Sequence, residues 1–533
     1  MRKFICYVVI LSVILLSGCV KKDVPVEQNN NVKDSIIYNI EKMPKDLVML
    51  NQYNPRQQDL LVNLFEGLVT MDDKGKILPG LSESWSISKD ETTYTFKIRE
   101  NAKWSDGSDI TSKDFVNFFS QILNKDTKNV YANDLYYIFG AEDYRKGNIP
   151  FNKVAIRAVN SKSLEIRLNY PCNYFLNILS EPIYSLRKID GNLTNWMSKY
   201  KDIEYTGGFK IDKISQDGNI TLKKNGNYWN SKAIKTSKIT ITSINESEAA
   251  LAAFQDYKID LFVKPPTSEV KSLVTSDQAI EMPLREGSAL VFNMQKEGII
   301  KNINIRNAIA LDIDRSKIVK EILKDTAKSA LSYIPPNTSN GIGGQYINKN
   351  FFTDTSQKEK ALALIKNNKI QENLQPLKLI YLDSVENKKV SESIAKSLKD
   401  ELNINVQCEG YEANKFDNEI KSGNYDIANV KYDGNYDYPL AFLENWVSNS
   451  SFNLYGYRNT KFDILVEKSK LEKDENKKLE YLKQAEDILI GDMAIVPLYF
   501  HNMIICKKDN IKDIYVTKQG NIKFDKVYIS PKK

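Results

Sequence analysis

Residues 377–408 read LKLIYLDSVENKKVSESIAKSLKDELNINVQC, and this stretch decides the class of fold. Leu377–Leu382 is a short apolar run of the length of a buried strand. Asn387–Leu402 repeats apolar residues at helical spacing and predicts an amphipathic helix. Ile404–Cys408 then predicts a second strand. A strand, a helix and a strand in this order form a βαβ unit with two parallel strands, so we expect an α/β fold.

Strands and helices alternate on both sides of this unit. Thr92–Ile98 alternates polar and apolar residues, the period of a half-buried strand. Thr111–Asn124 repeats large apolar residues at helical spacing, and Thr111 or Ser112 can cap the helix at its start. The other predicted elements are a strand at Leu164–Leu168 and helices at Ser247–Tyr257, Thr460–Lys470 and Asn476–Ile490. Since one hydrophobic core stops growing at about 250–300 residues, we expect two or three domains.

The composition is that of a globular protein and does not favour an enzyme or a nucleic-acid-binding protein. Hydrophobic residues make up 42% and charged residues 27% of the chain, and the net charge is +7, with lysines and acidic residues interleaved. His501 is the only histidine, and no nucleophile motif or glycine-rich phosphate loop accompanies it. Cys172, Cys408 and Cys506 lack the spacing of metal ligands. We therefore expect a structural histidine, no metal site, no cofactor and no catalytic centre, although acidic residues are too common to rule out a carboxylate-pair hydrolase.

The first residues predict export and attachment to a membrane. Arg2 and Lys3 precede the apolar run Phe4–Leu16, which is too short to span a bilayer and fits a secretory signal. Leu16-Ser17-Gly18-Cys19 resembles the lipobox of bacterial lipoproteins, in which the cysteine is lipidated. We expect a signal peptide at 1–18 and a lipid anchor with a flexible tether at 19–31, on the outer face of a bacterial cell membrane. The alternative is an ordinary secretory signal followed by a chance cysteine.

A series of short motifs follows one order along the chain. The motifs are NLFEGL at 63–68, PGLSESW at 79–85, WSDG at 104–107, TGGFK at 206–210, NGNYW at 225–229, RNAIALDIDR at 306–315 and IVPLY at 495–499. Each motif alone is unspecific, but together they resemble the family-5 extracellular solute-binding proteins, the oligopeptide and dipeptide receptors of ABC importers.

This resemblance implies a two-lobed α/β flytrap fold with an extra small domain. Two crossover strands would join the lobes as a hinge, and the ligand would bind between the lobes. The resemblance also implies a receptor, expected to be monomeric, that hands an oligopeptide to the permease subunits of an importer. The implied limits are 32–78, 200–284 and 504–533 for lobe I, 79–199 for the extra domain and 285–503 for lobe II.

The resemblance further implies which residues line the ligand cleft. Backbone N–H and C=O groups of an extended peptide need partners when buried, and strand-like pairing supplies them without reading side chains. For the side chains of Phe65 and Leu68, a place in the hydrophobic core stays an open alternative. The implied ligand-binding residues are Phe65, Glu66, Gly67, Leu68, Tyr131, Asn429, Lys431, Tyr432, Asp433, Gly434, Asn435, Tyr436 and Asp437.

The second of these stretches departs from the family pattern. Asn435 stands where peptide receptors commonly carry an aspartate that pairs with the ligand's α-ammonium group. An amide lacks the charge that makes an ammonium–carboxylate bond roughly twice as strong as a neutral one. Three outcomes are open: Asp433 or Asp437 takes over the amine, the ligand is long or blocked, or the ligand is not a peptide.

Two other ligand classes therefore stay open. One is a specific peptide pheromone, which would show as narrow selectivity for one hydrophobic peptide. The other is a non-peptide solute such as a metal chelate or haem. A single histidine, near the end of the chain rather than in the presumed cleft, argues against metal ligation by imidazole.

Overall fold

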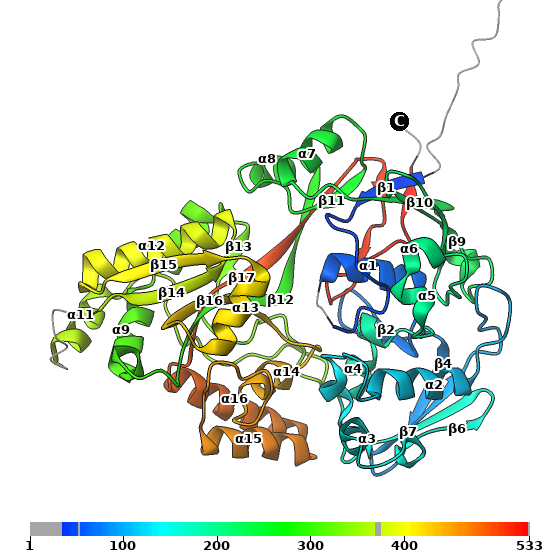
Figure 1. Cartoon of the computed structure of the whole chain (residues 1–533), viewed down its shortest axis with the longest axis horizontal. Coiled ribbons are helices and arrows are strands. Elements are labelled where there is room, and N and C mark those ends of the chain that lie inside the picture. Colours follow the sequence, from blue (N-terminus) through cyan, green and yellow to red (C-terminus); the bar gives the residue numbers. More distant parts are fainter. Residues whose placement is uncertain (1–34, 52–53, 368–374, 531–533) are drawn as a thin grey trace, which may run out of the picture.

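The computed structural model describes residues 35–51, 54–367 and 375–530. The expected signal peptide, the lipid-bearing Cys19 and the tether lie outside these residues. Figure 1 shows two lobes side by side, joined by two long strands and meeting again below them. Within the described part of the chain, no helix combines the length and the apolar character that crossing a membrane requires.

One mixed sheet of 11 strands extends through both lobes. Its order is β15-β14-β16-β12-β17-β11-β1-β10-β9-β8, and β13 pairs with β17 beside this path. Its strands are β1 (Ser35–Asn39), β8 (Phe209–Ile214), β9 (Ile220–Lys224), β10 (Lys238–Thr242), β11 (Leu261–Val263), β12 (Ala279–Phe292), β13 (Ala327–Ser329), β14 (Leu377–Leu382), β15 (Val406–Tyr411), β16 (Ile427–Asp433) and β17 (Ile495–Lys507).

The long strands β12 and β17 connect the lobes. They have 14 and 13 residues, and they run antiparallel from one lobe into the other (Figure 1). Their regular pairing stops after Pro283, which has no N–H to donate, and resumes at Gly287. This irregular stretch lies between the two halves of the sheet and gives the connection a place at which it can bend.

The first lobe, in blue and green at the right of Figure 1, has its own hydrophobic core. There β1 pairs in parallel with both β10 and β11. Helix α1 begins after Asn54, whose side chain accepts hydrogen bonds from the N–H groups of Arg56 and Gln57. The helices of this lobe are α1 (Pro55–Leu64), η4 (Ser231–Ala233), α7 (Ser247–Gln255) and α8 (Val270–Thr275). Its short strands are β2 (Val69–Met71), β3 (Ile77–Pro79), β18 (Ile511–Lys512), β19 (Tyr515–Val516), β20 (Ile522–Lys523) and β21 (Tyr528–Ile529).

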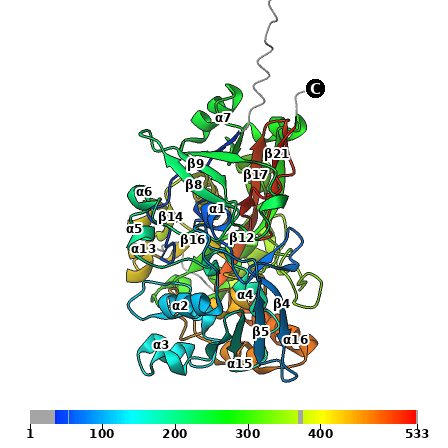
Figure 2. The same cartoon turned by 90° about the vertical axis from the view of Figure 1, so that its right-hand side faces the viewer.

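A separate four-stranded sheet, β4-β5-β7-β6, lies at the lower end of the molecule beside α2 and α3 (Figure 2). Helix α2 starts with a capping box, in which the Asp114 carboxylate accepts hydrogen bonds from the Thr111 N–H and hydroxyl groups. The predicted helix at Thr111–Asn124 is thus confirmed, with Thr111 as its cap. The elements here are β4 (Ser82–Ile87), β5 (Thr93–Ile98), α2 (Ser112–Leu123), η1 (Ala132–Leu135), α3 (Ala141–Lys146), η2 (Phe151–Lys153), β6 (Ile156–Asn160), β7 (Ser163–Arg167), α4 (Phe175–Leu179), η3 (Pro182–Tyr184), α5 (Gly191–Thr194) and α6 (Trp196–Lys199).

The other lobe contains the βαβ unit that the sequence predicts. Strands β14 and β15 are parallel, with Leu377 opposite Val406, and α12 connects them. Its other elements include the π-helix η6 and the helix pair α15 and α16. The helices of this lobe are η5 (Ile299–Lys301), α9 (Ile303–Asp312), α10 (Arg315–Lys317), η6 (Ile318–Ile322), α11 (Lys358–Asn367), α12 (Val385–Leu402), α13 (Ala413–Ser422), α14 (Leu440–Leu443), η7 (Glu444–Trp446), α15 (Thr460–Leu471) and α16 (Glu475–Gly491).

Candidate functional site

The segment that follows α1 lies in the interior of the first lobe. Phe65 is buried and stacks on Tyr205 with 5.8 Å between ring centroids. The Glu66 carboxylate accepts a hydrogen bond from the Tyr228 hydroxyl at 2.8 Å and another from the Trp229 indole N–H at 2.5 Å. Burial raises the pKa of Glu66 above its ordinary value. These side chains therefore serve packing and internal hydrogen bonding.

Gly67 and Leu68 join two of the sequence motifs to one another. The Gly67 carbonyl accepts a hydrogen bond from the Leu81 N–H at 2.8 Å, and the Leu68 carbonyl accepts one from the Ser82 hydroxyl at 2.7 Å. A Cβ atom on Gly80 would stand 2.5 Å from the Gly67 oxygen, so this close approach requires glycine. The NLFEGL and PGLSESW motifs thus form one structural junction.

The second predicted stretch begins on β16, where three side chains bind groups of their own lobe. Asn429 donates to the Ser391 hydroxyl on α12 at 3.2 Å. Tyr432 donates to the Tyr333 carbonyl at 2.8 Å. Lys431 lies 2.6 Å from the Glu286 carboxylate on the neighbouring strand β12, and this pair sits where β12 leaves the irregular stretch.

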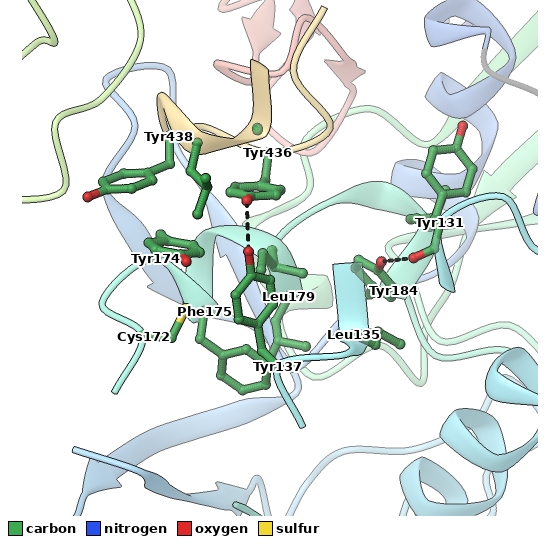
Figure 3. Close-up of a cluster of buried hydrophobic side chains, with 14 of the residues drawn as sticks. Tyr131, Leu135, Tyr137, Cys172, Tyr174, Phe175, Leu179, Tyr184, Tyr436 and Tyr438 are labelled. Atoms are coloured by element: carbon green, nitrogen blue, oxygen red, sulfur yellow. Dashed lines mark hydrogen bonds between the residues drawn. The ribbon is translucent and has the colours of Figure 1, made fainter. Parts of the chain in front are cut away.

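After β16 the chain reaches the contact between the lobes. Tyr438 stacks on Tyr174 with 4.3 Å between ring centroids, and Tyr436 stacks on the same ring at 5.4 Å. The hydroxyl groups of Tyr137 and Tyr436 are hydrogen-bonded at 3.2 Å. We call Tyr137, Tyr174, Tyr436 and Tyr438 the tyrosine cluster; Figure 3 shows the two later tyrosines above the two earlier ones. The cluster holds residues of the second lobe against the small four-stranded sheet and its helices.

Gly434 permits the turn that leads into this contact. A Cβ atom at Gly434 would lie 2.6 Å from the Phe442 ring. Because the ring is fully buried, it has no room to move aside.

Asp437 is fully buried and surrounded by donors from this chain. One carboxylate oxygen accepts from the Ser339 N–H at 2.8 Å and lies 3.9 Å from the Arg285 guanidinium. The other oxygen lies 2.8 Å from the Lys518 ammonium. Asp437 thus joins the second lobe to the C-terminal segment of the first and has its charge balanced.

Asn435 meets a carboxylate from the opposite side of the contact. Its amide N–H donates to Asp134 at 3.2 Å, and the Tyr184 hydroxyl lies 3.5 Å from the other Asp134 oxygen. Asp134 is 5% exposed, and burial, together with nearby Glu444, raises the pKa of Asp134 to about 8. Among the residues that the structure describes, no lysine or arginine lies within ion-pair distance of Asp134.

Glu181 adds a second carboxylate of high pKa. Burial raises the pKa of Glu181 to about 8, although the Arg285 guanidinium, 3.6 Å away, opposes this shift. Asp134, Asp433 and Asp437 raise the pKa further, so all four carboxylates lie close together. We call Asp134, Glu181, Asp433 and Asp437 the interlobe carboxylates.

Tyr131 lies at the edge of the same region. Its carbonyl accepts a hydrogen bond from the Tyr184 hydroxyl at 3.1 Å, and its ring extends away from the tyrosine cluster (Figure 3). Burial and the charge of Asp433 raise the pKa of the Tyr131 phenol. Of the predicted site residues, Tyr131, Asp433, Asn435, Tyr436 and Asp437 are therefore brought together, whereas Phe65–Leu68 and Asn429 serve other contacts.

Sequence reasoning did not find Asp134, Glu181, Arg285, Tyr174 or Lys518. These residues come from segments that are far apart along the chain, and no short motif contains them. The only local signal is that Asp134 follows the predicted Tyr131 by one helical turn.

His501 has the structural role that the sequence predicts. Its Nε2 atom is hydrogen-bonded to the Ser288 hydroxyl at 2.9 Å, and burial lowers the pKa of His501 to about 4. In the described ranges, no group of three or more His, Cys, Asp or Glu residues is arranged to hold a metal ion.

Several known proteins with similar sequences are named for peptide binding. A model of the bacterial extracellular solute-binding proteins, family 5 Middle, matches residues 76–453. The chain is 28% identical over 511 residues to the dipeptide-binding protein DppE of Bacillus subtilis (strain 168), covering 94% of both chains. It is 29% identical over 480 residues to the oligopeptide-binding protein OppA of the same organism, covering 87% of both. The crystal structure of the Haemophilus influenzae OppA complex with RPPGFSPFR matches with a TM-score of 0.80 at 23% identity, over 93% of this chain and 99% of that chain. The expected two-lobed α/β fold is thereby confirmed.

Proposed function

This chain belongs to the bacterial extracellular solute-binding proteins of family 5, and we propose that it binds oligopeptides outside the cell and delivers them to an ABC importer. The similar proteins of Bacillus subtilis are named for dipeptide and oligopeptide binding, which supports a peptide as the ligand. The proposal includes a monomeric receptor without catalytic activity, held at the outer face of the cell membrane by a lipid on Cys19.

The observation that carries this proposal is the polar contact between the two lobes, which the long strands β12 and β17 join. A ligand that touches both lobes stabilises the arrangement in which they meet, because it makes both sets of contacts only there. The interlobe carboxylates, Asn435 and Tyr131 line this contact and offer hydrogen-bonding groups from both sides.

We place the ligand's ammonium group at Asp134 and Asn435. Asp437, one of the two carboxylates considered from the sequence, already has Lys518 at 2.8 Å and the Ser339 N–H at 2.8 Å. Among the described residues, Asp134 has the neutral Asn435 amide and Tyr184 hydroxyl as donors and no basic partner, so its carboxylate can accept from an ammonium group. Asp433 lies close enough to add to the negative potential.

Native mass spectrometry of residues 20–533, followed by denaturing analysis of what is released, tests the proposed function. A ladder of mixed peptides is the expected result. One defined peptide would instead favour a pheromone receptor, and a non-peptide mass would contradict peptide binding. If the protein is empty, a thermal-shift screen with a peptide library decides, and the absence of any shift also contradicts the proposal.

The lipid anchor has its own test. Cys19→Ala removes the thiol that would carry the lipid, so the protein is expected to appear in the culture medium or the soluble fraction. Immunoblots of membrane and soluble fractions measure this redistribution, and Cys6→Ala serves as the control because it lies within the expected signal. A variant that stays in the membrane fraction would refute anchoring at Cys19.

A further inference from the structure

A cavity of about 140 Å³ lies in the second lobe, away from the contact between the lobes. It is enclosed by the end of α9, by α10 and η6, and by one face of α12, at the outer left of Figure 1. Six of its lining residues belong to α12. The cavity is lined by Asp312, Ile313, Asp314, Lys317, Ile318, Ser393, Ile394, Lys396, Ser397, Asp400 and Glu401.

Asp312 is the unusual member of this lining. It is 1% exposed and both of its carboxylate oxygens are buried. The Ser397 hydroxyl is its neighbouring donor, and no lysine or arginine of the described residues forms an ion pair with it. Burial raises the pKa of Asp312, while Ser397 and Lys358 oppose the shift. A buried carboxylate without a basic partner is strongly unfavourable in its charged form, so either a proton or a cation must balance it.

The other carboxylates of the cavity already have partners. Asp314 accepts a hydrogen bond from the Lys317 N–H at 2.8 Å. Asp400 is paired with Lys396, and Glu401 with Lys358. Asp312 therefore remains as the one uncompensated acid of this lining within the described chain.

The helix geometry adds to the negative potential at Asp312. Asp312 is the last residue of α9, so its carboxylate lies at the negative end of the helix dipole. The potential of the cavity thus favours a positive charge.

We propose that this cavity binds a small monovalent cation, an alkali-metal ion or a primary ammonium group, with Asp312 as its charged ligand. One uncompensated carboxylate matches a single positive charge, and the absence of a three-residue metal cluster in the described chain argues against a divalent ion. The Ser393 and Ser397 hydroxyl groups line the same cavity and can supply neutral oxygens. The volume suffices for a cation with several waters. This site is independent of peptide binding.

Thermal unfolding in different chloride salts tests the proposal. The protein is unfolded in potassium, sodium, ammonium and N-methylglucamine chloride at one pH and one ionic strength; the last cation is too bulky for the cavity. The Tm is expected to be higher by about 1–3 °C in the salt whose cation binds. A rise in potassium or sodium identifies an alkali-metal ion, and a rise in ammonium alone identifies an amine.

Two substitutions make the test specific to Asp312. Asp312→Asn keeps the shape but removes the charge, so the dependence of Tm on the cation is expected to disappear. Asp256→Asn, at an exposed residue that is paired with Lys258 and lies outside the cavity, is expected to retain the dependence. Equal Tm values in all four salts would overturn the proposal and leave Asp312 protonated, as would an unchanged dependence in Asp312→Asn.

A direct measurement covers the case in which Asp312→Asn fails to fold. Crystals of the unaltered protein soaked in thallium(I), which replaces potassium, are expected to show an anomalous peak beside the Asp312 carboxylate. Crystals that show no peak there, after a soak that saturates exposed sites, overturn the proposal for alkali-metal ions, and the ammonium arm then rests on the Tm in ammonium chloride alone.

Discussion

The interlobe carboxylates differ in what balances their charge. Asp437 has the Lys518 ammonium at 2.8 Å, and Glu181 has the Arg285 guanidinium at 3.6 Å. Among the described residues, Asp134 has an amide and a phenol as its donors. Because an unpaired charge is unfavourable in a buried site, Asp134 is the position at which a ligand cation gains most.

Exchanging the carboxylate and the amide of this pair tests that assignment. Asp134→Asn removes the carboxyl group that would pair with the ligand's ammonium group, so a peptide with a free amino terminus is expected to lose its advantage over the N-acetylated peptide, roughly tenfold to a hundredfold in Kd. The double variant Asp134→Asn, Asn435→Asp keeps the net charge and the hydrogen-bonded pair, so it is expected to restore the advantage. Calorimetric titration of matched peptide pairs measures both ratios.

The outcomes separate this assignment from peptide binding itself. If free and acetylated peptides bind the unaltered protein equally well, Asp134 does not receive an ammonium group, although the protein still binds peptides. If neither peptide binds, the proposed function itself fails.

The same residues predict how stability depends on pH. Burial raises the pKa of Asp134 and of Glu181 to about 8, whereas carboxylates in an unfolded chain titrate near about 4. Between these values the folded chain binds more protons than the unfolded chain, so the free energy of unfolding is expected to fall as pH rises from about 4 to about 8.

The double variant Asp134→Asn, Glu181→Gln removes both titrating groups and is expected to lose this fall. Urea unfolding at stepped pH compares the two proteins. His501, whose pKa burial lowers to about 4, contributes the opposite slope below about pH 6.5, but equally in both. Parallel pH profiles for the two proteins would contradict the raised pKa values.

Individual helices and strands can be predicted from features within a few residues of sequence, such as helix caps and apolar faces. Helix α2 begins where Thr111 and Asp114 form a capping box, and it buries the face that carries Phe115, Phe118 and Phe119. The βαβ unit around α12 likewise has a cap, at Ser384, whose hydroxyl accepts from the Asn387 N–H. Such caps satisfy N–H groups that a helix leaves without partners at its start.

Loss of the α2 cap is expected to destabilise the protein measurably. Thr111→Ala removes the hydroxyl that bonds to Asp114 and is expected to lower the free energy of unfolding by about 1 kcal/mol. Lys113→Ala, at an exposed position of the same turn, is expected to change it by less than about 0.5 kcal/mol. Urea denaturation followed by circular dichroism measures both, and equal values for the two variants would refute the cap's contribution.

At the scale of the whole molecule, the two lobes meet through the tyrosine cluster and are joined by β12 and β17 (Figure 1). The stacked rings of Tyr174 and Tyr438 form part of the contact between the lobes. The balance between open and closed arrangements therefore depends on how much this contact contributes.

Removing one ring is expected to shift that balance. Tyr438→Ala deletes the closest stacking partner of Tyr174, so the radius of gyration without ligand is expected to increase, and a bound peptide is expected to reverse the increase. Small-angle X-ray scattering measures this change, with circular dichroism to verify folding. Ile347→Ala, at a side chain that is 67% exposed, is the control. An unchanged radius in Tyr438→Ala would show that the cluster does not hold the lobes together.

By itself, the sequence determined the elements and the class of fold. Thr93–Ile98, Leu377–Leu382 and the helix ending at Leu402 follow from periodicity and capping, which act over a few residues. The order of the motifs, through the family resemblance, also determined the two-lobed architecture.

Only the tertiary structure decided how the site is composed. The sequence could not place Asp134 beside Asn435, or Tyr174 beside Tyr438, because each pair joins segments that are hundreds of residues apart. Nor could it tell that Asp437 is balanced by Lys518 whereas Asp134 and Asp312 have no basic partner among the described residues. Charge balance and burial depend on which distant segments pack together, and no local pattern carries that information.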